Sequence, residues 1–175
     1  LLQSSAASDV YKRQLFRCPQ DKLETADIAL VGVPHSTGNG TTERDQHLGP
    51  RAVRNVSALQ RRVHGDFKID PWNEAKIIDA GDVPFPRAND NEHCIEQITK
   101  FYKAIDNSNT RPVSIGGDHL VSLPILRALA KDKPVGMFQF DSHSDTWDSY
   151  FGGFKYTHGT PFRRAIEEGL INPKK

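Results

Sequence analysis

The run Ile28-Ala29-Leu30-Val31-Gly32-Val33 is the stretch that decides the fold, because it is continuously apolar and carries no charge. Short runs of this kind are typical of strands that are buried on both faces. Parallel sheets bury their strands in this way, since helices cover both faces of the sheet. The run therefore predicts an inner strand of an α/β protein.

Strand-like and helix-like segments alternate along the rest of the chain. Further strands are predicted at residues 76–79, 113–115 and 135–140, and helices at residues 49–63, 92–105, 120–130 and 161–168. The apolar stripe of the first helix consists of Ala52, Val53, Val56, Leu59 and Val63. Such alternation favours right-handed crossovers in a mainly parallel sheet. We therefore expect a three-layer α/β/α sandwich with helices on both faces.

Composition excludes several classes of function. The chain of 175 residues has 23 Lys and Arg against 22 Asp and Glu, which gives no electrostatic reason to bind nucleic acid or an anionic membrane. Its apolar runs are far shorter than the roughly 20 residues of a membrane-spanning helix. Cys18 and Cys94 form no CxxC pair, so we expect no disulfide and a cytoplasmic location.

The two ends of the sequence differ from the part between them. Residues 1–14 are polar, rich in Ser and Ala and without periodicity, which predicts a disordered or non-family leader. At the other end, Asn172-Pro173-Lys174-Lys175 follows a predicted helix without a closing element. We expect residues 15–175 to be the N-terminal part of a single domain that is truncated at its C-terminus.

Asp141-Ser142-His143-Ser144-Asp145 directly follows the predicted strand at 135–140. In extended backbone, alternate side chains point the same way, about 6.5–7 Å apart. Asp141, His143 and Asp145 would then face one cavity while the serines turn aside. The pattern indicates a metal site at the end of a strand.

Gly116-Gly117-Asp118-His119 follows the preceding predicted strand in the same manner. Ligands of open α/β sheets bind outside the carboxyl ends of the strands, so His119 and Asp141 are expected at one edge. Imidazole and carboxylate without thiolate suit Mn²⁺, Fe²⁺ or Zn²⁺. We expect Asp118 to support the backbone or the His119 ring, because metal-bound histidines need such partners.

The charges in this motif are too few for two metal ions. Two divalent ions carry four positive charges, whereas Asp141 and Asp145 supply two negative charges and a bridging hydroxide adds one. A stable two-metal site needs further acids, and we expect them beyond Lys175.

Together with two further motifs, these clusters resemble the ureohydrolase family of arginases, agmatinases and related guanidino-acid amidinohydrolases. The two motifs are Thr157-His158-Gly159-Thr160-Pro161-Phe162-Arg163-Arg164 and Gly49-Pro50-Arg51-Ala52-Val53-Arg54, and the resemblance runs from about Phe16 to Lys175. It implies an arginase-like fold with two Mn²⁺ ions. His119 and Asp145 would bind one ion, His143 the other, and Asp141 would bridge them. The later Asp-x-Asp pair of the family is missing here.

The resemblance also implies a reaction. A hydroxide bridging the metals would attack the guanidinium carbon, and His158 would carry the proton to the leaving amine. The substrate would be agmatine or a guanidino acid such as guanidinobutyrate, and the products urea and an amine. Family members assemble as trimers or hexamers. We expect residues 1–175 alone to be inactive.

Several alternatives stay open at this point. One alternative to a guanidino hydrolase is a formimidoylglutamate hydrolase, which releases formamide. The other is a catalytically silent regulatory homologue. The loop from Gly38 to His47 is either a structured turn or a contributor to substrate gating. The aromatic residues after the metal motif either wall the guanidinium entrance or pack structurally: Trp147, Tyr150, Phe151 and Phe154. The remaining histidines are expected to be non-catalytic: His35, His47, His64 and His93.

Overall fold

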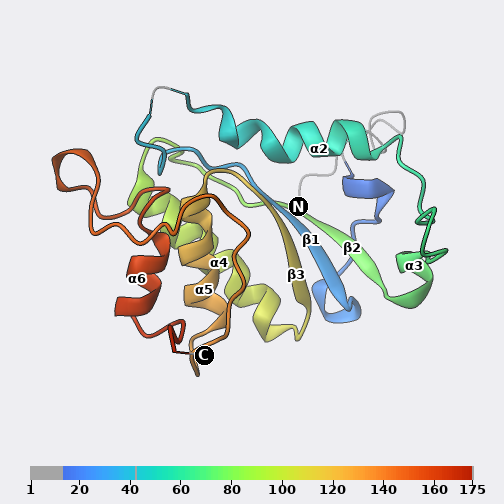
Figure 1. Ribbon diagram of the computed structural model, residues 1–175. Helices are drawn as coiled ribbons and strands as arrows, with labels where there is room; N and C mark the ends of the chain where they lie inside the picture. Colours follow the sequence, from blue (N-terminus) through green and yellow to red (C-terminus); the bar gives the residue numbers. More distant parts are fainter. Residues whose placement is uncertain (1–13, 42, 175) are drawn as a thin grey trace.

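The computed structural model describes residues 14–41 and 43–174, which form an α/β fold around a parallel sheet (Figure 1). The strands are β1 (Ile28–Val33), β2 (Ile77–Asp82) and β3 (Arg111–Gly116), in the spatial order β2-β1-β3. The helices are α2 (Gly49–Ser57), α3 (Pro71–Glu74), α4 (Asn91–Asn107), α5 (Ser122–Leu129) and α6 (Pro161–Glu167). Short 3₁₀ turns are η1 (Leu15–Arg17), η2 (Leu23–Thr25), η3 (Asp45–Leu48), η4 (His119–Val121) and η5 (Phe151–Gly153). Residues 1–13, nearly all of the predicted leader, lie outside the described residues.

β1 is the central strand, as its apolar sequence predicts. Both of its neighbours run parallel to it, and Ile28 stands opposite Ile77 of β2 and Arg111 of β3. Because successive side chains of a strand point to opposite faces, Val31 joins the core beneath α4 while Leu30 joins a smaller cluster on the other face. Burial on both faces thus explains the continuous apolar run.

Helices cover both faces of the sheet, which confirms the predicted architecture. α2 lies on one face, and α4 lies on the other with α5 and α6 beside it (Figure 1). Ile98, Tyr102 and Ile105 of α4 are fully buried against the strands. A second core fills the space between α4, α5 and α6, where Leu123 and Phe162 meet. In the part of the chain that the structure describes, no helix is long and apolar enough to cross a membrane.

α2 turns the polar Arg54 toward the sheet beside Val53, and only part of the apolar stripe of its sequence faces the core. The Arg54 guanidinium is buried and donates hydrogen bonds to Asp79 (3.1 Å from Nη2) and Asp82 (2.6 Å from Nη2). Val56 of the stripe is 60% exposed, and the predicted helix ends early, so that Leu59 lies beyond α2 and is 87% exposed. An amphipathic helix normally buries its apolar side. Here the ion pairs with β2 set the rotation of the helix instead.

The prediction of a fourth strand at residues 135–140 is wrong. Val135 makes one isolated parallel bridge to Ile171, and the rest of the segment has no strand structure. Phe138 and Phe140 are 95% and 100% exposed. A strand needs a partner for its backbone groups, and within the described residues none lies beside this segment. Its apolar sequence alone therefore does not produce a strand.

Replacing Arg54 by Ala would leave the buried Asp79 carboxylate without its cation. Removing one partner of a buried ion pair costs about 3–5 kcal/mol of stability. We expect the free energy of unfolding of the full-length protein to fall by this amount in urea titrations. The control is Arg51→Ala, an exposed residue on the same helix, with an expected change below about 0.5 kcal/mol. Equal stability of the two variants would contradict this account of the ion pair.

Burial raises the pKa of the Tyr102 phenol to about 12, against the opposing effect of its hydrogen bond with Ser114. Tyrosine in an unfolded chain titrates near about 10. Since the folded pKa is the higher one, the contribution of the neutral phenol is complete below about pH 10 and is lost as the pH rises toward about 12. Tyr102→Phe should therefore flatten the alkaline fall in stability, measured by urea unfolding at a series of pH values. The same slope in this variant and in Tyr156→Phe would refute the assignment.

Candidate metal centre

The carboxyl ends of β1 and β3 lie at one edge of the sheet, because the two strands are parallel and stay paired up to Val33 and Gly116. Ligands of open α/β sheets bind outside such ends. The loop after β1, the turn after β3 and the segment leading to α6 come together at this edge (Figure 1). The residues that the sequence predicts for a metal centre lie on these segments.

The turn after β3 depends on Gly117. Its φ is +49°, a left-handed conformation that favours glycine. A Cβ atom at this position would stand 2.5 Å from the Val33 carbonyl oxygen and 2.8 Å from that of His35. The turn therefore passes directly against the end of β1, and only a residue without a side chain fits there.

Asp118 is buried and holds two backbone segments at once. One of its carboxylate oxygens accepts from the Gly38 N–H (2.9 Å) and the other from the Leu120 N–H (3.0 Å). The second bond caps η4, the turn that begins with His119. Asp118 thus has the supporting role that the sequence predicts, and it acts on the backbone.

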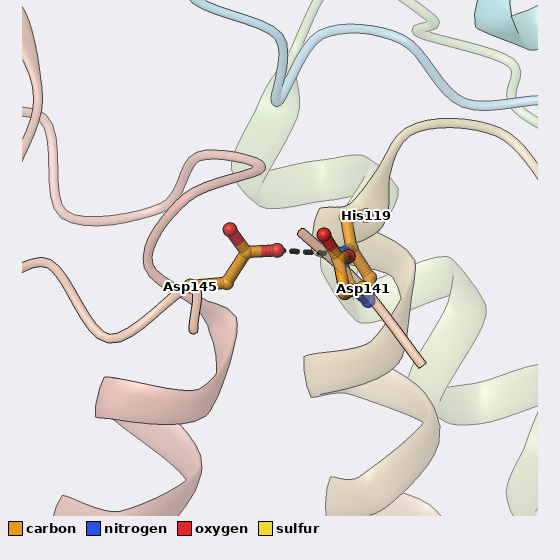
Figure 2. A group of neighbouring side chains, drawn as sticks. All are labelled: His119, Asp141 and Asp145. Atoms are coloured by element: carbon orange, nitrogen blue, oxygen red, sulfur yellow. Dashed lines mark ion pairs between the residues drawn. The ribbon is translucent and has the colours of Figure 1, made fainter. Parts of the chain in front are cut away.

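His119, Asp141 and Asp145 form a compact group of potential ligands, and Figure 2 shows the Asp145 carboxylate pointing toward the imidazole. The ligand atoms of the three side chains all lie within 4.8 Å of one another. The Nδ1 atom of His119 lies 3.2 Å from Oδ2 of Asp141 and also makes an ion-pair contact with Oδ2 of Asp145. Residues far apart in the sequence therefore converge on one point.

The donor set fits a divalent cation. A single ring nitrogen carries at most one hydrogen, yet two carboxylate oxygens converge on Nδ1 of His119. A cation among the three donors would interact favourably with both carboxylates and with the nitrogen lone pair. Carboxylate and imidazole without thiolate suit Mn²⁺, Fe²⁺ or Zn²⁺. The two negative charges balance one such ion.

Asp145 reaches the group through a turn, not through extended backbone. Its φ is +50°, and the neighbouring residues 141–143 form a bend. The Asp145 carbonyl oxygen accepts from the N–H of Phe162 (3.2 Å), at the start of α6. The Phe162 ring in turn meets the His119 ring edge-on, at 5.2 Å between centroids. The first turn of α6 therefore positions two of the potential metal ligands, Asp145 and His119.

His143 does not lie with the other predicted ligands. Its side chain is 82% exposed, and its Nδ1 atom is 3.7 Å from Oδ1 of Asp141. The expected alternation of side chains fails because the backbone bends: the His143 N–H donates to Oδ1 of Asp141 (2.9 Å). This hydrogen bond holds the pKa of Asp141 below its ordinary value. A ligand role for His143 stays a prediction.

His158 is held against the loop that follows β1. Its backbone N–H donates to the Gly38 carbonyl oxygen (2.8 Å). Its Nδ1 atom lies 3.2 Å from the same oxygen and 3.3 Å from the Gly40 nitrogen, so it either donates to the first or accepts from the second. Both contacts use Nδ1, which leaves Nε2 as the atom for proton exchange. The catalytic role of His158 stays a prediction.

His35 is the residue whose importance the sequence analysis missed. It is buried, and its Nε2 atom lies 2.9 Å from the Thr37 hydroxyl and 3.1 Å from Oδ1 of Asn91. Its Nδ1 atom faces Oδ2 of Asp118 at 3.2 Å. The sequence signal that could have identified His35 is its position just after β1, in the loop that leads to Gly38. The imidazole contributes to the geometry of the site without being placed in the ligand group.

The loop from Gly38 to His47 is a structured turn, and its contribution to substrate gating stays a prediction. Internal hydrogen bonds order it, since Asn39 accepts from the Thr41 N–H (2.9 Å) and donates to the Glu43 carbonyl oxygen (2.6 Å). It also lines a cavity beside His158, together with Tyr150 and Phe154. Trp147 is 62% exposed, and its ring lies 5.2 Å from that of Tyr150. The Phe151 side chain lies outside the described part of the structure.

Comparisons with known proteins agree with this geometry. The model of the arginase family matches residues 26–175. The chain is 49% identical over 146 residues to guanidinopropionase of Pseudomonas aeruginosa. The aligned region covers 83% of this chain and 45% of that protein. Its fold is similar to that of proclavaminate amidino hydrolase from Streptomyces clavuligerus, with a TM-score of 0.83, 31% identity and coverage of 92% of this chain and 53% of that one. It is also similar to Trypanosoma cruzi formiminoglutamase with Mn²⁺, at a TM-score of 0.73, 26% identity and coverage of 90% and 54%.

The protein therefore belongs to the arginase family, and its α/β fold is of the arginase type. Both predictions from the sequence motifs are confirmed. The chain spans about half the length of the relatives that it matches.

Replacing Asp145 by Asn would remove one carboxylate charge from the group of three donors. Loss of a partner outside the ligand shell already weakens metal affinity by about 10–100-fold, so we expect Mn²⁺ binding to weaken at least tenfold. Calorimetric titration of metal-depleted full-length protein measures this, with the exposed Asp66→Asn as the charge-matched control. Equal affinity in the two variants would show that the group is not the metal site.

Proposed function

We propose that the complete protein is a manganese-dependent hydrolase that cleaves a guanidino compound, agmatine or a guanidino acid, into urea and an amine. The observation that carries the proposal is the convergence of His119, Asp141 and Asp145 at the carboxyl edge of the sheet. Membership of the arginase family and the similarity to a guanidinopropionase and an amidino hydrolase support it.

In this proposal His119 and Asp145 would hold one Mn²⁺ ion, His143 would hold the second, and Asp141 would contribute to both. The metal supplies a water molecule whose pKa is lowered toward about 7, which provides a nucleophile at neutral pH. The relative with Mn²⁺ and the hard donor set support manganese. A second ion needs further carboxylates from the complete protein, since the two aspartates balance only one.

His158 is proposed as the proton carrier of the reaction. The guanidinium carbon is a weak electrophile because its charge is delocalised, and the leaving amine must receive a proton. An imidazole titrates in the range that such a transfer requires at neutral pH. The contacts of Nδ1 with the loop after β1 hold the ring in place and do not involve Nε2.

Assembly as a trimer or hexamer and a cytoplasmic location are further parts of the proposal. The free thiols of Cys18 and Cys94 support a reducing compartment. We also propose that residues 1–175 alone lack turnover, because a second metal ion would be short of ligands.

The decisive measurement is a substrate panel on full-length protein loaded with Mn²⁺, with urea as the product measured. We expect urea from agmatine or a guanidino acid, and a fall in kcat of about 10²–10⁴-fold in His158→Gln with Mn²⁺ binding retained. His64→Gln, which changes an exposed histidine outside the site, is the matched control. Release of urea at the control rate by His158→Gln would remove His158 from the mechanism.

The same panel separates the two alternatives. Similarity to a formiminoglutamase favours including formimidoylglutamate, and release of formamide in place of urea would replace the proposed reaction. Absence of turnover on every compound, with Mn²⁺ bound, would identify a silent homologue.

A further inference from the structure

A cavity of about 260 Å³ lies between the loop after β1 and the segment that leads to α6. The two segments run side by side in Figure 1 and are joined by the hydrogen bond from the His158 N–H to Gly38. Small-molecule sites of this kind are concave, with apolar walls and a few polar groups. Three aromatic residues supply most of the apolar wall: Tyr150, Phe154 and Tyr156.

The cavity is lined by residues that contact His158, although His158 itself is not part of its lining. Gly38 and Gly40 line it, and both contact the Nδ1 atom of His158 through their backbone. The Tyr150 ring also lines it and lies 5.1 Å from the His158 ring. In the proposed reaction, a substrate that receives a proton from His158 at one end would extend its other end into this neighbouring cavity.

Arg44 gives the cavity its charge. It is the one ionisable group with a full charge at neutral pH among the lining residues, which include no aspartate or glutamate. Its Nε atom donates to the Thr41 carbonyl oxygen (3.2 Å), which orients the guanidinium plane. Among residues 14–41 and 43–174, no carboxylate forms an ion pair with it. A guanidinium of this kind binds a carboxylate through two parallel hydrogen bonds.

We propose that Arg44 binds the carboxylate of the substrate, and that the enzyme prefers a short guanidino acid to agmatine. This inference rests on the proposed function, whose two substrate classes it separates. A guanidino acid ends in a carboxylate, which Arg44 attracts, whereas agmatine ends in an ammonium group, which Arg44 repels. The aromatic wall contacts the methylene groups between the two ends.

The test compares Arg44→Gln with Arg61→Gln in full-length protein loaded with Mn²⁺. Both arginines are exposed, so neither change threatens the fold, and Arg61 lies on the α2 side of the molecule. The substrates are 3-guanidinopropionate, 4-guanidinobutyrate and agmatine. We expect wild-type kcat/KM to be highest for one of the acids, and KM for that acid to rise about 10–100-fold in Arg44→Gln, because a charge-assisted hydrogen-bonded pair is lost. Arg44→Glu should shift the preference toward agmatine.

Wild-type preference for agmatine, or equal KM values for the acid in the two Gln variants, would overturn the role of Arg44 and leave the proposed function intact. Absence of turnover on all three compounds would instead overturn the proposed function. In that case, calorimetric titration with 3-guanidinopropionate tests the binding role of Arg44 independently of turnover. Binding that is lost in Arg44→Gln and kept in Arg61→Gln supports it, and equal or absent binding in both refutes it.

Discussion

The buried carboxylate of Asp118 is the interaction on which the geometry of the site depends. Water does not compensate its charge, so the protein must supply hydrogen-bond donors, and it does so from two segments. One donor, the Gly38 N–H, belongs to the loop that lines the cavity with Arg44, and the other, the Leu120 N–H, belongs to the turn that carries His119. The same group therefore holds His119, a predicted metal ligand, at a fixed position relative to the loop that lines the cavity.

Both faces of the sheet carry an apolar cluster, and the α2 face has buried ion pairs in addition. On the α4 face, apolar side chains such as Ile98 fill the space against β1. On the α2 face, Asp79 lies beneath Arg54 and also accepts from the Leu15 N–H (2.8 Å), so that ionic contacts tie the first described turn to the sheet. Residues 29–33 of β1 are buried, up to the end from which the loop with His35 and Gly38 begins.

Sequence reasoning succeeded where one local pattern determines the outcome, as in the apolar run of β1 and the helical spacing of Ile98, Tyr102 and Ile105. It also predicted that His119 and Asp141 lie close together, although in the structure only His119 follows a strand and Asp141 follows a segment without strand structure. It failed where the outcome depends on contacts between distant residues. The residues 135–140 have strand-like composition but no partner among the described residues, and Asp145 takes a left-handed turn that its pairing with the start of α6 imposes.

Gly117 has a consequence for how the protein can evolve. The position tolerates no side chain, because the end of β1 occupies the space where a Cβ would stand. Every coding change at a glycine adds at least a methyl group, so each one would push the turn away from the strand and carry His119 with it. Sequence divergence at this edge of the sheet is thus channelled into the loop around Arg44, where exposed residues can vary without moving His119.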